Sequence, residues 1–467
     1  MERERADFIN ESEIQDILAQ ARVAGPEEAH RILDKAEHGK GLRAEEAAVL
    51  LELADSELLK RMYHLAAVIK EKIYGKRVVL FAPIYISNFC VNNCRYCGYR
   101  HQNELNRRRL SMEELADEVR ILESLGHKRL ALECGEDPVQ APIEYVLEAI
   151  RTIYQVKEEN GSIRRVNVNI AATTVDEYRL LKEAGIGTYI LFQESYHRET
   201  YTKVHPSGPK RDYDWHTTAM DRAMTGGIDD VGLGILFGLY DHKFELIALL
   251  KHAEHLEERF GVGPHTVSFP RLKPAQGVEM GQFSLVQDDD FRKLIAITRL
   301  ALPYTGIILS TREKAELRDE LINQGVSQIS AGSCTGVGGY SQEHAKQLVK
   351  QLDPQFTVED VRTPDETLQS VCRAGFIPSY CTACYRQGRT GDRFMALAKS
   401  GQIQNVCQPN AILTFKEFLL DYASPELKRI GEQTIQAHLE QIADPRIRAL
   451  TVERLGRITA GERDFYF

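Results

Sequence analysis

Short β-type runs alternate with amphipathic helical segments through the middle of this 467-residue chain. We expect eight strands, at residues 78–86, 129–134, 166–171, 189–194, 231–237, 266–271, 307–310 and 328–331. Apolar residues at helical spacing lie between them, for example in residues 112–125, 175–184 and 291–301. Eight such alternations in about 250 residues predict an α/β fold, a (β/α)8 TIM barrel. A doubly wound open sheet has the same succession of elements and remains an alternative.

The sequence on both sides of the predicted barrel is helical. Residues 1–76 predict an N-terminal helical extension, in which Ser12 is a candidate cap and residues 47–73 carry apolar positions at helical spacing. Residues 341–467 predict a helical C-terminal domain. The barrel itself is assigned to residues 77–340.

Composition excludes several classes of protein. A formal net charge of −9 argues against a nucleic-acid surface. No apolar run approaches the ~20 residues of a membrane helix, and the charged first residues do not resemble a secretory signal. Six of the nine cysteines fall in two clusters, which indicates metal sites in a reducing cytoplasm rather than disulfides. We therefore expect a cytoplasmic protein that binds neither nucleic acid nor membrane.

The first cysteine cluster follows the first predicted strand. Cys90, Cys94 and Cys97 have the spacing C-x3-C-x2-C, with Tyr96 just before the third cysteine. Three thiolates can bind three irons of a 4Fe–4S cluster and leave the fourth iron open to a small molecule. A zinc knuckle with His101 as a further ligand, or a disulfide, is the alternative.

This motif resembles the signature of the radical S-adenosylmethionine (SAM) superfamily. The resemblance implies that the open iron binds SAM, which one electron cleaves to a 5′-deoxyadenosyl radical. It also implies that Tyr96 packs near the adenine of SAM. Glu136, in the segment Cys134-Gly135-Glu136, resembles the glutamate that contacts the amino group of SAM, although a cysteine replaces the first glycine of the family's motif.

Polar residues occur where the predicted strands end, which in a barrel is the mouth that holds the active site. Besides Glu136, we expect Asn169 and Glu194 to contact the cofactor. An α-carboxylate in the substrate requires a cation, best an arginine. Arg271 and Arg312, which follow strands six and seven, are the candidates.

The second cysteine cluster lies beyond the predicted barrel. Cys381, Cys384 and Cys407 have the spacing C-x2-C-x22-C, again with three thiols and no obvious fourth. Cys372 is a candidate for the vacant position, and a four-cysteine zinc site is the alternative to an iron–sulfur cluster.

With both clusters in view, essentially the whole chain resembles the tyrosine lyases that mature FeFe-hydrogenase. The resemblance implies cleavage of the Cα–Cβ bond of L-tyrosine to p-cresol and dehydroglycine. Dehydroglycine would become CO and cyanide at a second 4Fe–4S cluster, and His265 would bind an additional iron there. It also implies an electron donor such as ferredoxin or flavodoxin, and hydrogenase maturation proteins as partners.

Two other functions remain open. The related 2-iminoacetate synthases of thiazole synthesis share the first reaction but are shorter and lack the second cluster. A non-catalytic iron–sulfur scaffold would transfer iron without cleaving SAM.

Overall fold

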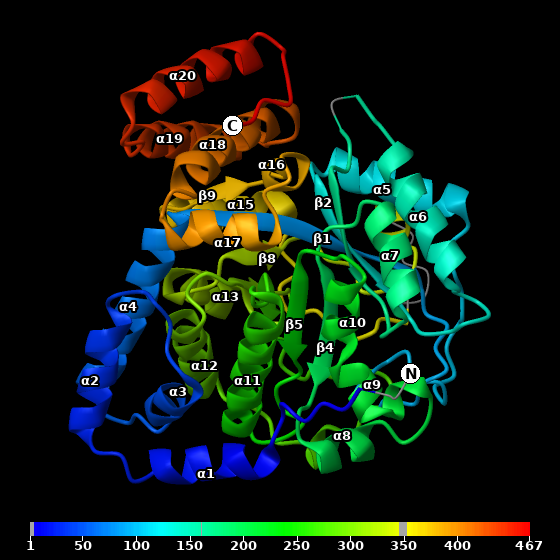
Figure 1. Cartoon of the computed structure of the whole chain (residues 1–467). Coiled ribbons are helices and arrows are strands. Elements are labelled where there is room, and N and C mark those ends of the chain that lie inside the picture. Colours follow the sequence, from blue (N-terminus) through cyan, green and yellow to red (C-terminus); the bar gives the residue numbers. More distant parts are fainter. Residues whose placement is uncertain (1–3, 160, 345–352) are drawn as a thin grey trace.

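The computed structural model describes residues 4–159, 161–344 and 353–467, and eight parallel strands close into a barrel at its centre (Figure 1). The strands are β1 (Arg77–Ser87), β2 (Arg129–Cys134), β3 (Arg165–Asn169), β4 (Tyr189–Glu194), β5 (Val231–Ile235), β6 (Thr266–Ser268), β7 (Gly306–Leu309) and β8 (Gln328–Ser330). Neighbours follow chain order from β2 to β8, and β1 pairs with both β8 and β2. This pairing confirms the (β/α)8 barrel and excludes the open sheet.

Strand β1 shows why the sequence closes in this way. Its run of Val, Leu, Phe and Ile is almost wholly buried, as expected for a parallel strand covered on both faces. Val79 pairs with Gln328 of β8, and Ala82 pairs with Leu130 of β2. Strands β5 and β6 are shorter than predicted, although a single bridge between Phe237 and Arg271 continues their direction.

Helices surround the barrel and occupy both flanking segments. Those of the barrel region are α5 (Met112–Ser124), α6 (Ile143–Gln155), α7 (Val175–Glu183), α8 (Arg198–Val204), α9 (Tyr213–Thr217), α10 (Ala219–Thr225), α11 (His242–Phe260), α12 (Asp288–Ala301), α13 (Ala315–Gln324) and α14 (Gly339–His344). The C-terminal helices are α15 (Pro364–Arg373), α16 (Ala383–Arg386), α17 (Gly391–Lys399), α18 (Gln404–Asp421), α19 (Pro425–Glu440) and α20 (Pro445–Thr459). None of the helices in the described ranges is both long and apolar enough to span a membrane.

Four helices precede the barrel: α1 (Glu11–Ala21), α2 (Pro26–Ala36), α3 (Ala44–Leu51) and α4 (Ser56–Tyr74). The predicted cap Ser12 is wrong, because Asn10 accepts hydrogen bonds from the N–H groups of Ser12 and Glu13. The apolar stretch at residues 47–73 is divided between α3 and α4, since Asp55 caps a new helix there.

The C-terminal region is not wholly helical. A ninth strand, β9 (Ile377–Ser379), pairs in parallel with residues 77–79 of β1. Three residues that include a proline give too weak a pattern to predict a strand. The strand leads the chain directly into Cys381. The two domain boundaries remain predictions.

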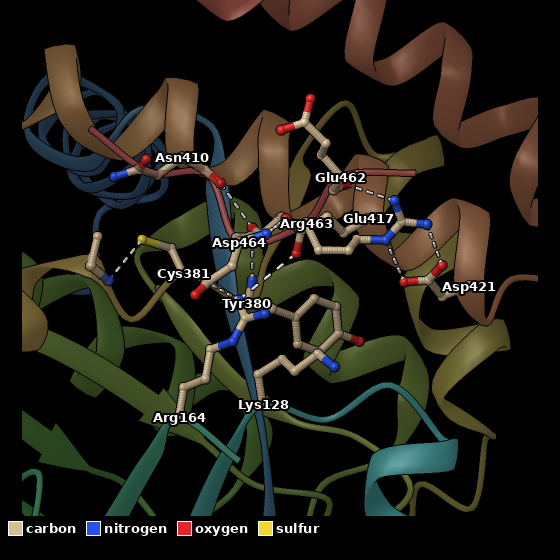
Figure 2. A network of polar contacts seen from close by, with 12 residues as sticks. Lys128, Arg164, Tyr380, Cys381, Asn410, Glu417, Asp421, Glu462, Arg463 and Asp464 are labelled. Atoms are coloured by element: carbon tan, nitrogen blue, oxygen red, sulfur yellow. Dashed lines mark hydrogen bonds and ion pairs between the residues drawn. The ribbon is translucent and has the colours of Figure 1, made fainter. Parts of the chain in front are cut away.

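The end of the chain is tied to the barrel by charged groups (Figure 2). Asp464 lies 3.0 Å from Arg164, at the start of β3, and accepts two hydrogen bonds from Arg386 of α16. Arg463 pairs with Asp421 of α18 at 2.6 Å. These contacts join the terminal segment to the barrel wall, to α16 and to α18. Cys384 lies on α16, and Cys407 lies on α18.

Candidate functional site

The larger of the two cavities that cysteines line opens at the mouth formed by the carboxyl ends of the strands. Cys90, Cys94 and Cys97 line it, together with residues from the ends of β2, β3, β4 and β7. This is the end of a barrel at which active sites are built. Its volume is about 200 Å³.

Hydrogen bonds and close packing hold the cysteine loop in place after β1. The guanidinium of Arg107 donates to the carbonyl oxygens of Asn88 and Tyr99, at 2.6 and 2.7 Å. Gly98 packs against the backbone of residues 354 and 355, where a Cβ would lie 2.5 Å from the carbonyl oxygen of Pro354. The chain is therefore pre-shaped before any cofactor binds.

The thiols of this loop fit an iron–sulfur cluster. Burial raises the pKa of Cys97 to about 11 and that of Cys94 further still, so both thiols are neutral unless a metal supplies positive charge. Cys134 also lines the cavity, but its thiol donates to the Gly135 carbonyl oxygen. His101, the candidate zinc ligand, is exposed, and its Nδ1 lies 3.3 Å from the carbonyl oxygen of Cys90.

Across the described residues, no three His, Cys, Asp or Glu side chains lie close enough to share one metal ion. The thiolates of a 4Fe–4S cluster bind separate irons, so they need not converge on one point. The spacing of the thiols is therefore compatible with the cluster.

The four predicted cofactor contacts all line the larger cavity. The hydroxyl of Tyr96 lies 2.7 Å from Nε2 of His205. Glu136 accepts a hydrogen bond from the side-chain amide of Asn92, and burial raises the pKa of Glu136.

The other two predicted contacts, Asn169 and Glu194, already have polar partners. Asn169 donates to Glu133 at 2.8 Å, and Glu194 pairs with Lys210 at 2.7 Å. The structure therefore gathers these side chains around one space, although they come from different strands and loops.

The two candidate arginines are separated. Arg312 lines the cavity, with its guanidinium 3.2 Å from the ring centroid of Phe356. Arg271 is not among the lining residues; it pairs with the buried carboxylate of Glu313 and with Asp288 at 2.8 Å. Only Arg312 is placed to meet a ligand in the cavity.

Sequence reasoning missed two charged residues of this cavity. Glu133 is the fifth residue of β2, and Lys210 lies in the segment between α8 and α9. The position of Glu133 near a strand end was a usable signal. Lys210 had none, because its approach depends on how the segment folds back over the cysteine loop.

A second, smaller cavity of about 60 Å³ lies at the opposite mouth. Cys381, Cys384, Cys407 and His265 line it, with residues from the amino ends of β1, β2, β7 and β8. Its volume is well below that of the larger cavity. Cys372 is not a lining residue; its thiol interacts with Thr434.

Positive charge surrounds these three thiols. Arg77, Arg129 and Arg389 line the small cavity, and the Nε atom of each is buried without a hydrogen-bond partner. A hydrogen bond from Cys384 lowers the pKa of Cys407, and the charges of Arg77 and Arg389 lower it further. A cluster held by thiolates carries negative charge, which these guanidinium groups would balance.

His265 faces the same space, with Nδ1 3.5 Å from Asp230 but without a hydrogen-bond partner. Burial lowers the pKa of His265, which keeps the ring neutral. A neutral imidazole is the form that binds a metal.

Neighbouring residues of the same strands line the two cavities. On β2, Arg129 lines the small cavity and Ala131 lines the large one. On β8, Gln328 lines the small cavity and Ser330 lines the large one. At this depth Ala131 and Ser330 are small, whereas Phe81 of β1 and Ile308 of β7, which also line the large cavity, are bulky.

Two family descriptions match this chain. The radical SAM superfamily matches residues 84–253, and the biotin and thiamin synthesis associated domain matches residues 268–377. The 2-iminoacetate synthase of Escherichia coli (strain K12) is 30% identical over 347 residues, which is 74% of this chain and 89% of that protein.

Two solved structures are similar over nearly the whole chain. A crystal structure of HydG, a maturase of the FeFe-hydrogenase, is 60% identical, with a TM-score of 0.96, and covers 99% of this chain and 100% of its own. The HydG of Carboxydothermus hydrogenoformans is 40% identical, with a TM-score of 0.84, and covers 96% and 99%.

Proposed function

We propose a function from one premise: this chain belongs to the HydG family of radical SAM enzymes. The radical SAM family implies a 4Fe–4S cluster and SAM. When bound, these supply a 5′-deoxyadenosyl radical. Cys90, Cys94 and Cys97 would hold the cluster at the larger cavity.

The proposed first reaction is cleavage of the Cα–Cβ bond of L-tyrosine, which gives p-cresol and dehydroglycine. Arg312 binds the substrate carboxylate, because a guanidinium matches a carboxylate with two parallel hydrogen bonds. Tyr96, Glu136, Asn169 and Glu194 contact SAM. The enclosed barrel mouth shields the radical from water.

The proposed second reaction converts dehydroglycine to CO and cyanide at the smaller cavity. Cys381, Cys384 and Cys407 would hold a second 4Fe–4S cluster there, and His265 an additional iron. Its products would serve hydrogenase maturation proteins, and a ferredoxin or flavodoxin would supply electrons. We further propose the domain boundaries at residues 76/77 and 340/341.

The observation that carries this proposal is the pair of cysteine-lined cavities at opposite mouths of one barrel. A 2-iminoacetate synthase needs only the first cavity. A scaffold that stores iron needs no polar cavity beside its cysteines. Two reactions in series account for both cavities.

The test is anaerobic reconstitution with iron, sulfide, reductant, SAM and tyrosine, with p-cresol and CO assayed together. We expect Cys384→Ala to retain p-cresol and to lose CO, because the first reaction needs only the first cluster. Cys94→Ala should abolish 5′-deoxyadenosine, the product of SAM cleavage. Wild-type protein that makes p-cresol but no CO would favour the 2-iminoacetate synthase alternative.

A further inference from the structure

Two partly buried ionisable groups of opposite sign face the larger cavity without being paired. Glu133, on β2, accepts a hydrogen bond from Asn169, and Arg312, beyond β7, stacks on Phe356. Neither makes an ion pair with another of the residues that the structure describes. The buried Arg318, by contrast, is paired with Asp360.

Such an arrangement is costly unless a ligand completes it. An isolated buried charge is strongly disfavoured, so the group shifts its pKa instead. Burial raises the pKa of Glu133 to about 8, although Arg312 and the hydrogen bond from Asn169 act in the opposite direction. Near neutral pH the carboxyl of Glu133 is therefore mostly protonated in the free protein.

An α-amino acid supplies both missing partners. Its carboxylate suits Arg312, and its ammonium group, one carbon away, suits a carboxylate. We propose that Glu133 binds the α-amino group of the substrate and takes its proton before the radical acts there. This inference rests on the proposed function, in which the hydrogen atom is removed from the amino group of tyrosine.

The proton balance is simple and involves no oxidation. The ammonium group and ionised Glu133 become a free amine and protonated Glu133: one N–H bond breaks, one O–H bond forms, and the electron pair stays on nitrogen. Because Glu133 is protonated before tyrosine binds, the zwitterion displaces that proton to solvent. Binding near pH 7 should therefore release about one proton.

The other titratable groups near Glu133 do not take this role. Tyr85 of β1 and Tyr99 of the cysteine loop have pKa values raised well above the ordinary range by burial, so both remain neutral. The Cys134 thiol is likewise kept neutral by burial. Arg312 carries a positive charge and cannot accept a proton.

The test compares Glu133→Gln with Glu245→Gln. The amide introduced by Glu133→Gln keeps the shape of the side chain and an oxygen for Asn169 but cannot take a proton. Glu245 is a matched control, since it is buried, has a pKa raised to about 8, and lies outside the cavity, bonded to Ser195 and Tyr196. Holoenzyme with SAM but no reductant binds ligand without turnover.

Calorimetry in buffers of different ionisation enthalpy measures the affinity and the protons released. For wild type and Glu245→Gln we expect release of about one proton with tyrosine near pH 7, declining as pH rises through about 8. For Glu133→Gln we expect no proton release and at least a tenfold loss of tyrosine affinity. The affinity for 3-(4-hydroxyphenyl)propanoate, which lacks the amine, should change less than twofold.

Turnover gives the second readout. In Glu133→Gln, p-cresol formation should fall about 100-fold or more near pH 7 and recover as pH rises, because free amine then arrives from solution. Glu133→Asp should restore part of the rate. Equal loss of affinity for both ligands, or unchanged proton release, overturns the inference. Wild-type protein that makes p-cresol separates such a result from failure of the proposed function, and wild-type protein that binds no tyrosine overturns both.

Discussion

At the scale of single residues, Arg271 and Arg312 have the same sequence pattern and different surroundings. Each follows a strand, and either could have reached a ligand. Glu313 separates them, because its buried carboxylate pairs with Arg271 and holds that side chain outside the cavity. Arg312 stacks on the ring of Phe356 and lines the cavity.

This difference predicts that the same substitution, arginine to glutamine, has different effects at the two positions. Arg312→Gln should raise the KM for tyrosine about 100-fold, since a buried charge loses its partner at a cost of about 3 kcal/mol. Arg271→Gln should leave KM near its wild-type value and destabilise the fold by about 1–3 kcal/mol, because Lys273 only partly replaces it beside Glu313. Steady-state kinetics and thermal unfolding together distinguish the two. A KM unchanged in Arg312→Gln would remove its proposed role.

The sequence alone identified those residues whose spacing along the chain indicates their chemical role. Cys90, Cys94 and Cys97 could be assigned to one site from eight consecutive residues. Sequence reasoning assigned no role to Glu133, because a lone charge near a strand end is usually solvated, or to Lys210, which lies between α8 and α9 without a recognisable pattern. Their burial in one cavity depends on contacts between distant segments.

At the scale of elements, the terminal segment restrains the second cysteine site. It contacts α18 and Arg164, just before β3, through Asp464 and Arg463, as Figure 2 shows. Asp464 also accepts hydrogen bonds from Arg386 of α16. Arg389, which lines the small cavity, donates to the carbonyl oxygen of Phe467, the last residue.

Removal of residues 463–467 should therefore disorder the second site and leave the first intact. We expect the truncated protein to lose the iron of the second cluster and CO formation, while p-cresol formation falls less than threefold. Iron analysis and product assays measure this. Arg457→Ala is the control, because its pair with Glu462 is exposed and contributes little. Full iron content in the truncated protein would show that the segment is dispensable.

The strands were predictable because each is a short, buried apolar run between turn residues. The ninth was not, since Ile377–Ser379 is held as a strand by β1 rather than by its own composition. The cap at Asn10 was missed for a similar reason: Ser12 has equal intrinsic preference, and the helix begins where the side chain of Asn10 meets two free N–H groups.

At the scale of the whole molecule, the barrel sets the relation between the two cavities. Closure by pairing of β1 with β2 puts one cysteine group at each mouth. Strand counting predicted the barrel. It could not predict which residues line each cavity, because which residues face inward at the same depth depends on the stagger of the strands.

Larger side chains between the two cavities should block the second reaction and leave the first nearly unchanged. In Ala131→Leu combined with Ser330→Leu, we expect p-cresol formation to stay within about threefold of wild type while CO falls at least tenfold. Extra volume in a packed interior costs about 1–3 kcal/mol, so thermal unfolding must be checked. Ala131→Ser is the matched control. Equal losses of both products would mean that the change damaged the first site.

The two cavities are lined by neighbouring inward-facing residues, at positions 129 and 131 of β2 and at 328 and 330 of β8. This arrangement affects the path of the substrate fragment between the two reactions. We expect a fragment that passes directly from one cavity to the other inside the barrel not to mix with the bulk pool. With tyrosine labelled at its carboxyl and α-carbons, CO and cyanide should therefore keep the full label, even when unlabelled glyoxylate and ammonia are present in excess. Mass spectrometry of the two products reads this directly, and dilution of the label would mean that the fragment leaves the protein between its two reactions.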